Sequence, residues 1–295
     1  MEREHIVAEL PQQRENQDLE ERARPFRALY EHWEGNQWSP LSLDFSRDRE
    51  SFEALDEERR EGLVWIFSHR FHAEFKVATI LSPFVLRAPD YDLQVVLATQ
   101  LADEFRHMQC VLRVYEEVFG IRGMERVKAI ADANLDPIAS TLYGALERWV
   151  APLETSADED RFLQASVAYH LIAEGVVART AQNLAAGQYA RFGDFPGLTE
   201  GQRLVARDEA RHIGIGVSYA RRRLTADRER ATAVIGEVVE YFADISSSLL
   251  ETALQDSMDS QVLAGYGVEA EGFYAEAMRL WGIRLRSIGF LADEL

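Results

Sequence analysis

The sequence is poor in residues that interrupt helices or form cross-links. Its 295 residues include 18 Gly, 8 Pro and a single cysteine, Cys110. One cysteine cannot form an internal disulfide, which favours a reducing compartment, and we expect a cytoplasmic protein. The chain also lacks a signal-peptide pattern and any run of about 18 apolar residues, so we expect no membrane span.

Basic residues are outnumbered by acidic residues. The chain has 32 Lys and Arg against 50 Asp and Glu, which gives a formal net charge of −18. An acidic surface repels phosphates, and no basic stripe is present, so we expect no nucleic-acid partner. Hydrophobic residues make up 47% of the chain, enough for a large core. The composition shows no boundary, so we expect one domain over residues 1–295.

Apolar residues recur with helical spacing along most of the chain, and no set of segments alternates as strands do. Residues 1–45, which contain three prolines, are expected to form an irregular arm. Helices are expected over 56–87 with a break at Pro83, and over 90–119, 123–133, 137–152, 158–188, 199–224, 225–255 and 268–290. The sequence therefore predicts an all-α helical bundle.

Two of these helical segments carry the same motif, Asp-Glu-x-Arg-His, at 103–107 and 208–212. In a helix, a glutamate and a histidine three residues apart lie on one face, about one turn apart, so they can bind one metal ion together. Two such helices that face each other would provide two metal positions. The four ligands expected from the motifs are Glu104, His107, Glu209 and His212.

A dinuclear centre of this kind takes one further glutamate from each of two other helices. Glu74 and Glu174 lie among apolar neighbours in two other helical segments, where an unpaired carboxylate would be costly. Four carboxylates balance two divalent cations, and carboxylate with imidazole suits iron or manganese, as an Fe/Fe or Mn/Fe pair. The alternatives are a buried lattice of ion pairs and a helical scaffold without metal.

The sequence resembles the ferritin-like superfamily of carboxylate-bridged dimetal proteins. Within it, the chain is most similar to the branch of the ribonucleotide reductase small subunit and the ligand-binding oxidases. The resemblance rests on the six ligands and on residues 37–49, QWSPLSLDFSRDR. Reductase small subunits carry a similar Trp-x-Pro-x-x-(Val/Leu/Ile)-Asp-x-Ser-x-Asp run before the first ligand helix. The resemblance implies a ferritin-like bundle, the same ligands and a homodimer.

The resemblance also implies roles for residues around the metals. It implies that Asp208 accepts a hydrogen bond from His107, with Trp38 on its other side as an electron route or an anchor of the arm. In the ligand-binding oxidases, a tyrosine five residues before the third glutamate can be cross-linked to a valine two after the first. This chain has Tyr169 at the former position but Lys76 at the latter, so the cross-link stays open. Lys76 is either a pocket cation or a surface charge.

Two departures argue against ribonucleotide reduction. Reductase small subunits store a radical on a tyrosine four residues after the first ligand histidine, where this chain has Val111. Their C-terminal tail carries an aromatic relay, whereas residues 288–295 contain no tyrosine. His170, on the same helical face as Glu174, is either an additional ligand or, as we favour, a hydrogen-bonded histidine behind the ligands.

We therefore expect an O2-activating dimetal oxidase or oxygenase with O2 as co-substrate. The substrate would be a small organic or acyl molecule, changed by C–H hydroxylation, desaturation or N-oxygenation. A catalytic cycle would need two external electrons, which implies a reductase or ferredoxin as electron donor. The alternatives are a divergent ribonucleotide reductase small subunit and a ferritin-like metal store.

Overall fold

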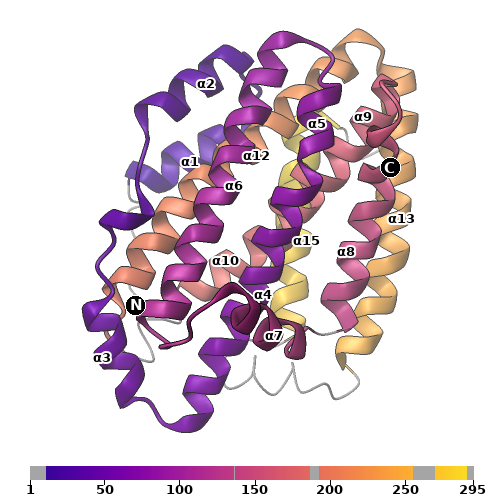
Figure 1. Ribbon diagram of the computed structural model, residues 1–295. Helices are drawn as coiled ribbons and strands as arrows, with labels where there is room; N and C mark the ends of the chain where they lie inside the picture. Colours follow the sequence, from indigo (N-terminus) through magenta and orange to yellow (C-terminus); the bar gives the residue numbers. More distant parts are fainter. Residues whose placement is uncertain (1–10, 136, 187–192, 255–269, 291–295) are drawn as a thin grey trace, which may run out of the picture.

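The computed structural model describes residues 11–135, 137–186, 193–254 and 270–290. Every regular element in these ranges is a helix, which confirms the all-α prediction (Figure 1). The longest helices are α4 (Glu57–Ile80), α6 (Tyr91–Glu117), α12 (Pro196–Ala226), α13 (Arg228–Leu254) and α15 (Ala270–Ile288). The shorter ones are α3 (Ser46–Ala54), α5 (Ser82–Arg87), α7 (Met124–Ala133), α8 (Pro137–Val150) and η2 (Ala151–Glu154).

The helix expected over 158–188 changes type along its length. It begins as α9 (Glu159–Ser166), continues as the π-helical segment η3 (Val167–Ala178) and ends its described part as α10 (Arg179–Ala186). The predicted end near Gly187 lies outside the described residues, as do residues 291–295 of the tail. A π-helix hydrogen-bonds five residues back, and such segments occur frequently at functional sites.

Local signals fix several helix ends. The side chains of Asp56 and Asp90 cap α4 and α6, each accepting a hydrogen bond from the backbone N–H three residues later at 2.9 Å. The predicted break at Pro83 is confirmed, since α4 ends at Ile80 and α5 begins at Ser82. Helix α12 begins three residues earlier than expected, because Pro196 occupies the first helical position, where a proline costs no hydrogen bond.

The expectation of an irregular arm is wrong for most of its described part. This part contains α1 (Pro11–Glu21), α2 (Phe26–Gly35) and the short turn η1 (Pro40–Ser42). The prolines lie at or just before the starts of these helices, so they separate helices rather than prevent them. Tertiary packing then stabilises both α-helices, because α1 lies against α12 and α2 against α6, with Leu19 and Leu29 buried.

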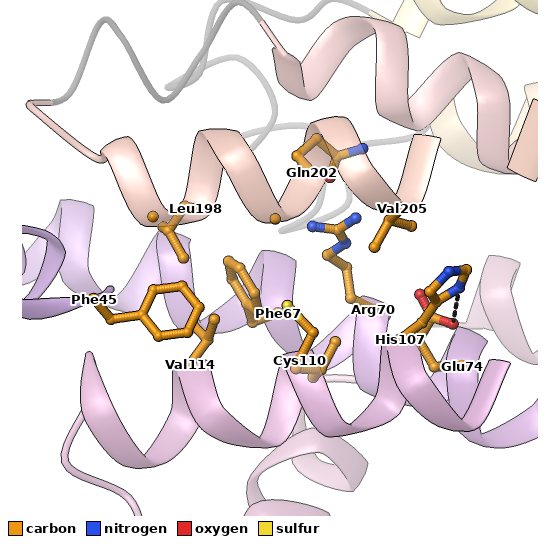
Figure 2. A pocket seen from close by; sticks show the side chains of 13 residues that line it. Phe45, Phe67, Arg70, Glu74, His107, Cys110, Val114, Leu198, Gln202 and Val205 are labelled. Atoms are coloured by element: carbon orange, nitrogen blue, oxygen red, sulfur yellow. Dashed lines mark ion pairs between the residues drawn. The ribbon is translucent and has the colours of Figure 1, made fainter. Parts of the chain in front are cut away.

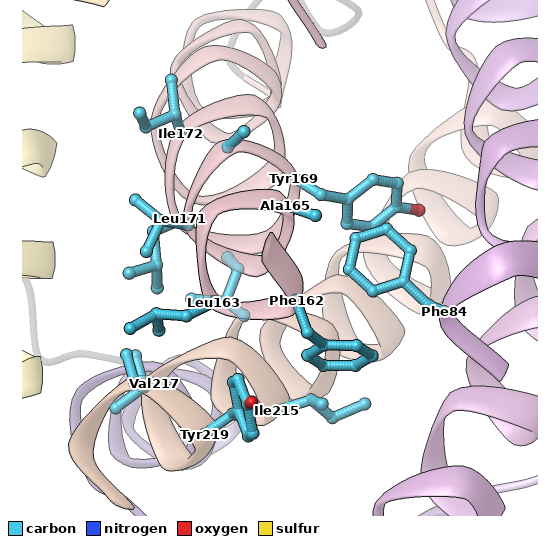
Figure 3. Packing of buried hydrophobic residues seen from close by; sticks show 14 of the residues in the cluster. Phe84, Phe162, Leu163, Ala165, Tyr169, Leu171, Ile172, Ile215, Val217 and Tyr219 are labelled. Carbon is cyan, nitrogen blue, oxygen red and sulfur yellow. The ribbon is translucent and has the colours of Figure 1, made fainter. Parts of the chain in front are cut away.

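Four helical elements form the centre of the bundle. Helix α4 packs along α6, α6 contacts α12, and α12 packs against η3. Helix α15 covers η3, while α13 packs on α9 and α12 (Figure 1). Aromatic rings fill the space beside η3: Phe84 lies 5.4 Å from Phe162 and 5.5 Å from Tyr169 between ring centroids (Figure 3).

None of the helices in the described part of the chain is long and apolar enough to cross a membrane.

The close approach of α12 to η3 requires a glycine at position 216. A Cβ added to Gly216 would overlap the Cβ of His170 on the facing helix, so Gly216→Ala is expected to destabilise the fold by about 1–3 kcal/mol. Gly236 on α13 has open space around its Cα, so Gly236→Ala should be neutral or stabilising by up to about 1 kcal/mol. Urea unfolding of the two variants measures the difference. Equal stabilities would contradict the packing described here.

Candidate metal centre

The six side chains predicted as ligands lie together in the centre of the bundle. All are buried, with exposed fractions of 7% or less. Helix α4 provides Glu74, α6 provides Glu104 and His107, η3 provides Glu174, and α12 provides Glu209 and His212. Their ligand atoms form two groups in which every pair of atoms lies within 4.8 Å. The first group is Glu74, Glu104, His107 and Glu209, and the second is Glu104, Glu174 and His212.

Each group is arranged around one imidazole nitrogen. His107 Nδ1 lies 3.5 Å from both Glu74 Oε2 and Glu104 Oε2, and 3.4 Å from Oε1 of Glu209. His212 Nδ1 lies 3.3 Å from Glu104 Oε1 and 3.8 Å from Glu174 Oε1. It also lies 3.5 Å from Oε2 of Glu209. Glu104 and Glu209 therefore turn one oxygen toward each imidazole, whereas Glu74 and Glu174 each serve one side.

The donor atoms of the site fit a pair of metal ions. Nδ1 of His107, Nδ1 of His212 and Oε2 of Glu174 are buried and have no hydrogen-bond partner among the described residues. Unpartnered buried polar atoms are costly. One cation beside His107 and a second beside His212 and Glu174 would satisfy all three atoms. Carboxylate oxygens combined with imidazole nitrogens are the donors that iron and manganese accept.

The charges of the site also favour cations. Burial raises the pKa of Glu74, and it raises the pKa of Glu174 well above its ordinary value. Burial opposes ionisation of Glu104 and Glu209 too, but the adjacent imidazoles outweigh it and lower the pKa of both carboxyls. The two glutamates that face both imidazoles are therefore held ionised, as metal ligands must be.

An aspartate lies behind the first imidazole. Oδ2 of Asp208 lies 3.3 Å from Nε2 of His107 and accepts a hydrogen bond from the indole of Trp38 at 2.7 Å. This contact fixes which nitrogen of His107 faces the glutamates. The Trp38 ring also stacks on the imidazole of His107, with 6.4 Å between centroids.

Sequence reasoning missed the matching arrangement on the second imidazole. Oδ2 of Asp103 lies 3.2 Å from Nε2 of His212, and Oδ1 of Asp103 accepts a hydrogen bond from the Trp33 indole at 2.8 Å. The signal was available, because Asp103 holds in the first motif the position that Asp208 holds in the second. Each motif thus provides the aspartate for the histidine of the other.

Two arginines complete this network. Arg106 Nη1 lies 2.9 Å from Asp103 and 3.3 Å from Asp208, so one guanidinium joins both aspartates. Arg211, which is buried, pairs with Asp103 at 2.7 Å. Burial opposes ionisation of Asp103, but its contacts with His212 and Arg211 outweigh burial and hold its pKa well below the ordinary value.

His170 contacts the site through another side chain. Its Nε2 lies 3.0 Å from Gln100 Oε1, and the amide nitrogen of Gln100 donates to Glu174 at 2.9 Å. Burial lowers the pKa of His170 to about 3, so the ring is neutral at ordinary pH. His170 belongs to neither group of potential ligand atoms, and Gln100, which sequence reasoning missed, connects it to the glutamate.

The other two predicted residues lie in different surroundings. Tyr169 is fully buried, and its hydroxyl donates a hydrogen bond to Glu104 Oε1 at 3.2 Å. Lys76 forms an ion pair with Glu147 and keeps 33% of its side chain exposed. This position agrees with the interpretation of Lys76 as a surface charge and not with that of a pocket cation.

The exchanged aspartates predict site-selective effects on metal binding. Asp103→Asn is expected to weaken binding at the His212 position by about 10–100-fold, because the imidazole loses its charged acceptor. Asp208→Asn should act in the same way on the His107 position and serves as the matched variant. Metal titration combined with anomalous diffraction measures each position separately. Loss at the same position in both variants would contradict the assignment.

Comparisons with known proteins agree with this geometry. The family model described as ribonucleotide reductase, small chain, matches residues 22–266. Two solved variants of an R2-like ligand-binding oxidase, one with an anaerobically and one with an aerobically reconstituted Mn/Fe cofactor, have the same fold. They are 20% and 19% identical, with TM-scores of 0.76 and 0.77, and each match covers 91% of this chain and 94% or 95% of the other. The chain therefore belongs to the ribonucleotide reductase small-chain family.

Proposed function

We propose that the protein is an O2-activating dimetal oxidase or oxygenase whose chain forms one dimetal domain. The observation that carries the proposal is the buried group of four glutamates and two histidines, in which neither Nδ1 atom has a hydrogen-bond partner in the described part of the chain. The similar solved structures carry a Mn/Fe cofactor, which supports an Fe/Fe or Mn/Fe pair in this chain. Glu104 and Glu209 would help to hold both ions, because each turns one oxygen toward His107 and the other toward His212.

The residues around the ligands would control orientation, water and electrons. When bound in reduced form, two such ions supply the electrons that activate O2. Asp103 and Asp208 hold the imidazoles in place, and the apolar residues around the site limit the access of water. Trp38 is half-buried and contacts both Asp208 and His107, so we assign it the path for electrons from an external reductase or ferredoxin.

The proposed substrate is a small organic or acyl molecule, and the proposed outcome is C–H hydroxylation, desaturation or N-oxygenation. A homodimer in the cytoplasm is the state that we propose for the protein. Tyr169 lies five residues before Glu174, which is the position of the cross-linking tyrosine in the ligand-binding oxidases. Its hydroxyl donates a hydrogen bond to Glu104. Lys76 lacks the branched Cβ of the valine to which that tyrosine can be cross-linked. Its side chain instead forms an ion pair with Glu147.

A second candidate is a divergent ribonucleotide reductase small subunit, which the family membership favours. Position 111 argues against it. Val111 is 4% exposed on α6 and has no phenol to hold a radical. The oxidase therefore remains the proposal that the site supports best, while a ferritin-like metal store would leave Trp38 and its aspartate without a role.

Reaction with O2 tests the proposal. Protein loaded anaerobically with two Fe(II) per chain is expected to consume O2 rapidly and to develop the absorption of an oxidised dimetal centre in stopped-flow measurements. Glu104→Ala should abolish both signals, because it removes a ligand from each metal position. Glu147→Ala, on the surface, is the control and should react like the unaltered protein.

Two results would count against the oxidase. Unchanged O2 consumption in Glu104→Ala would contradict the role of this centre. A stable tyrosyl radical in electron paramagnetic resonance spectra after the reaction would instead favour the reductase subunit.

A further inference from the structure

A small cavity lies on the His107 side of the metal centre, between α4, α6 and α12 (Figure 2). Its volume is about 10 Å³, which is room for about one water molecule. One end of the cavity is lined by Glu74 and His107. The apolar side chains in its walls are Phe45, Phe67, Val111, Val114, Leu198 and Val205. The cavity therefore lies between one predicted metal position and a set of apolar side chains.

A buried amide without partners lines this cavity. Gln202 on α12 is 6% exposed, and neither its oxygen nor its nitrogen has a hydrogen-bond partner among the described residues. Such a group is costly to bury, and native proteins pair nearly all of them. The amide of Gln202 is therefore available to hydrogen-bond a polar ligand at this wall.

A cation faces the same space. Arg70 lies one helical turn before Glu74 on α4, and in Figure 2 its guanidinium group reaches toward α12, where Gln202 and Val205 lie. The guanidinium carbon of Arg70 lies 5.6 Å from the centroid of the Phe67 ring. None of the ion pairs among the described residues includes Arg70. In a chain with a net charge of −18, an arginine that lines a cavity and forms no ion pair with the described residues is available for an external anion.

We propose that Arg70 and Gln202 bind the carboxylate of a small organic acid, with the rest of the molecule directed toward Glu74 and His107. The inference rests on the proposed function, because it names the substrate class of that site. A guanidinium binds a carboxylate through two parallel hydrogen bonds, and the amide nitrogen of Gln202 adds a third donor. The apolar walls suit the hydrocarbon or aromatic part of the acid.

The acid enters only if the cavity enlarges. Gln202 and Arg70 are free to change rotamer, because among the described residues Gln202 has no hydrogen bond and Arg70 has no ion pair. Changes of side-chain rotamer of this kind are common on binding. The backbone of the wall is more constrained, since a Cβ added at Gly201 would lie 3.3 Å from Cys110 Sγ.

Calorimetric titration with benzoate and with its neutral analogue benzamide tests this site in the metal-loaded protein. We expect benzoate to bind at least tenfold more tightly than benzamide. Arg70→Met should remove this preference, Arg70→Lys should restore part of it, and Gln202→Leu, which is similar in size, should weaken benzoate severalfold. Arg126→Met, an exposed arginine on α7, is the control and should keep the full preference.

The metal content of each sample separates this inference from the proposed function. Equal affinity for benzoate and benzamide, or a preference that survives in Arg70→Met, would overturn the carboxylate site even if two metals are bound. If the carboxylate binds the metals directly, the preference for benzoate would survive in Arg70→Met. If the protein takes up no metal, the proposed function fails, and the same titrations on the metal-free protein still decide whether Arg70 and Gln202 bind a carboxylate.

Discussion

Four carboxylates buried among apolar residues are the constraint on which the rest of this structure depends. Ionised groups in such surroundings need nearby positive charge and hydrogen-bond donors. The two imidazoles lie directly against the glutamates, and each imidazole contacts an aspartate that is paired in turn with arginine. The layers alternate between acidic and basic groups from the centre outward, and two metal ions would supply the positive charge that lets all four central carboxylates ionise.

The exchange of aspartates between the two motifs links the charge balance to the helix packing. Asp103 on α6 contacts the histidine of α12, and Asp208 on α12 contacts the histidine of α6. A shift of one helix along the other would break both contacts at once, and Arg106 spans the two aspartates. The helices are therefore held in one register, and that register brings Glu104 and Glu209 between both imidazoles.

Features that depend only on neighbouring residues in the chain could be predicted from the sequence alone. The i, i+3 spacing of glutamate and histidine indicates a shared helical face, and Pro83 indicates a helix break. Features that depend on how helices face each other were not predictable in this way. The contact of Asp103 with His212 requires the relative rotation of α6 and α12, and the helices of the N-terminal segment are stabilised by packing on α6 and α12. That Gln202 finds no hydrogen-bond partner among the residues the structure describes is likewise a property of the packing, not of the local sequence.

The central claim is that two metal ions bind between these four helical elements. Crystals of the protein grown with iron and manganese, measured at the absorption edges of both metals, test it most directly. The account predicts two anomalous peaks per chain, one beside Nδ1 of His107 and one beside Nδ1 of His212, with Glu104 and Glu209 contacting both. A single peak, no peak, or peaks bound by other side chains would contradict it.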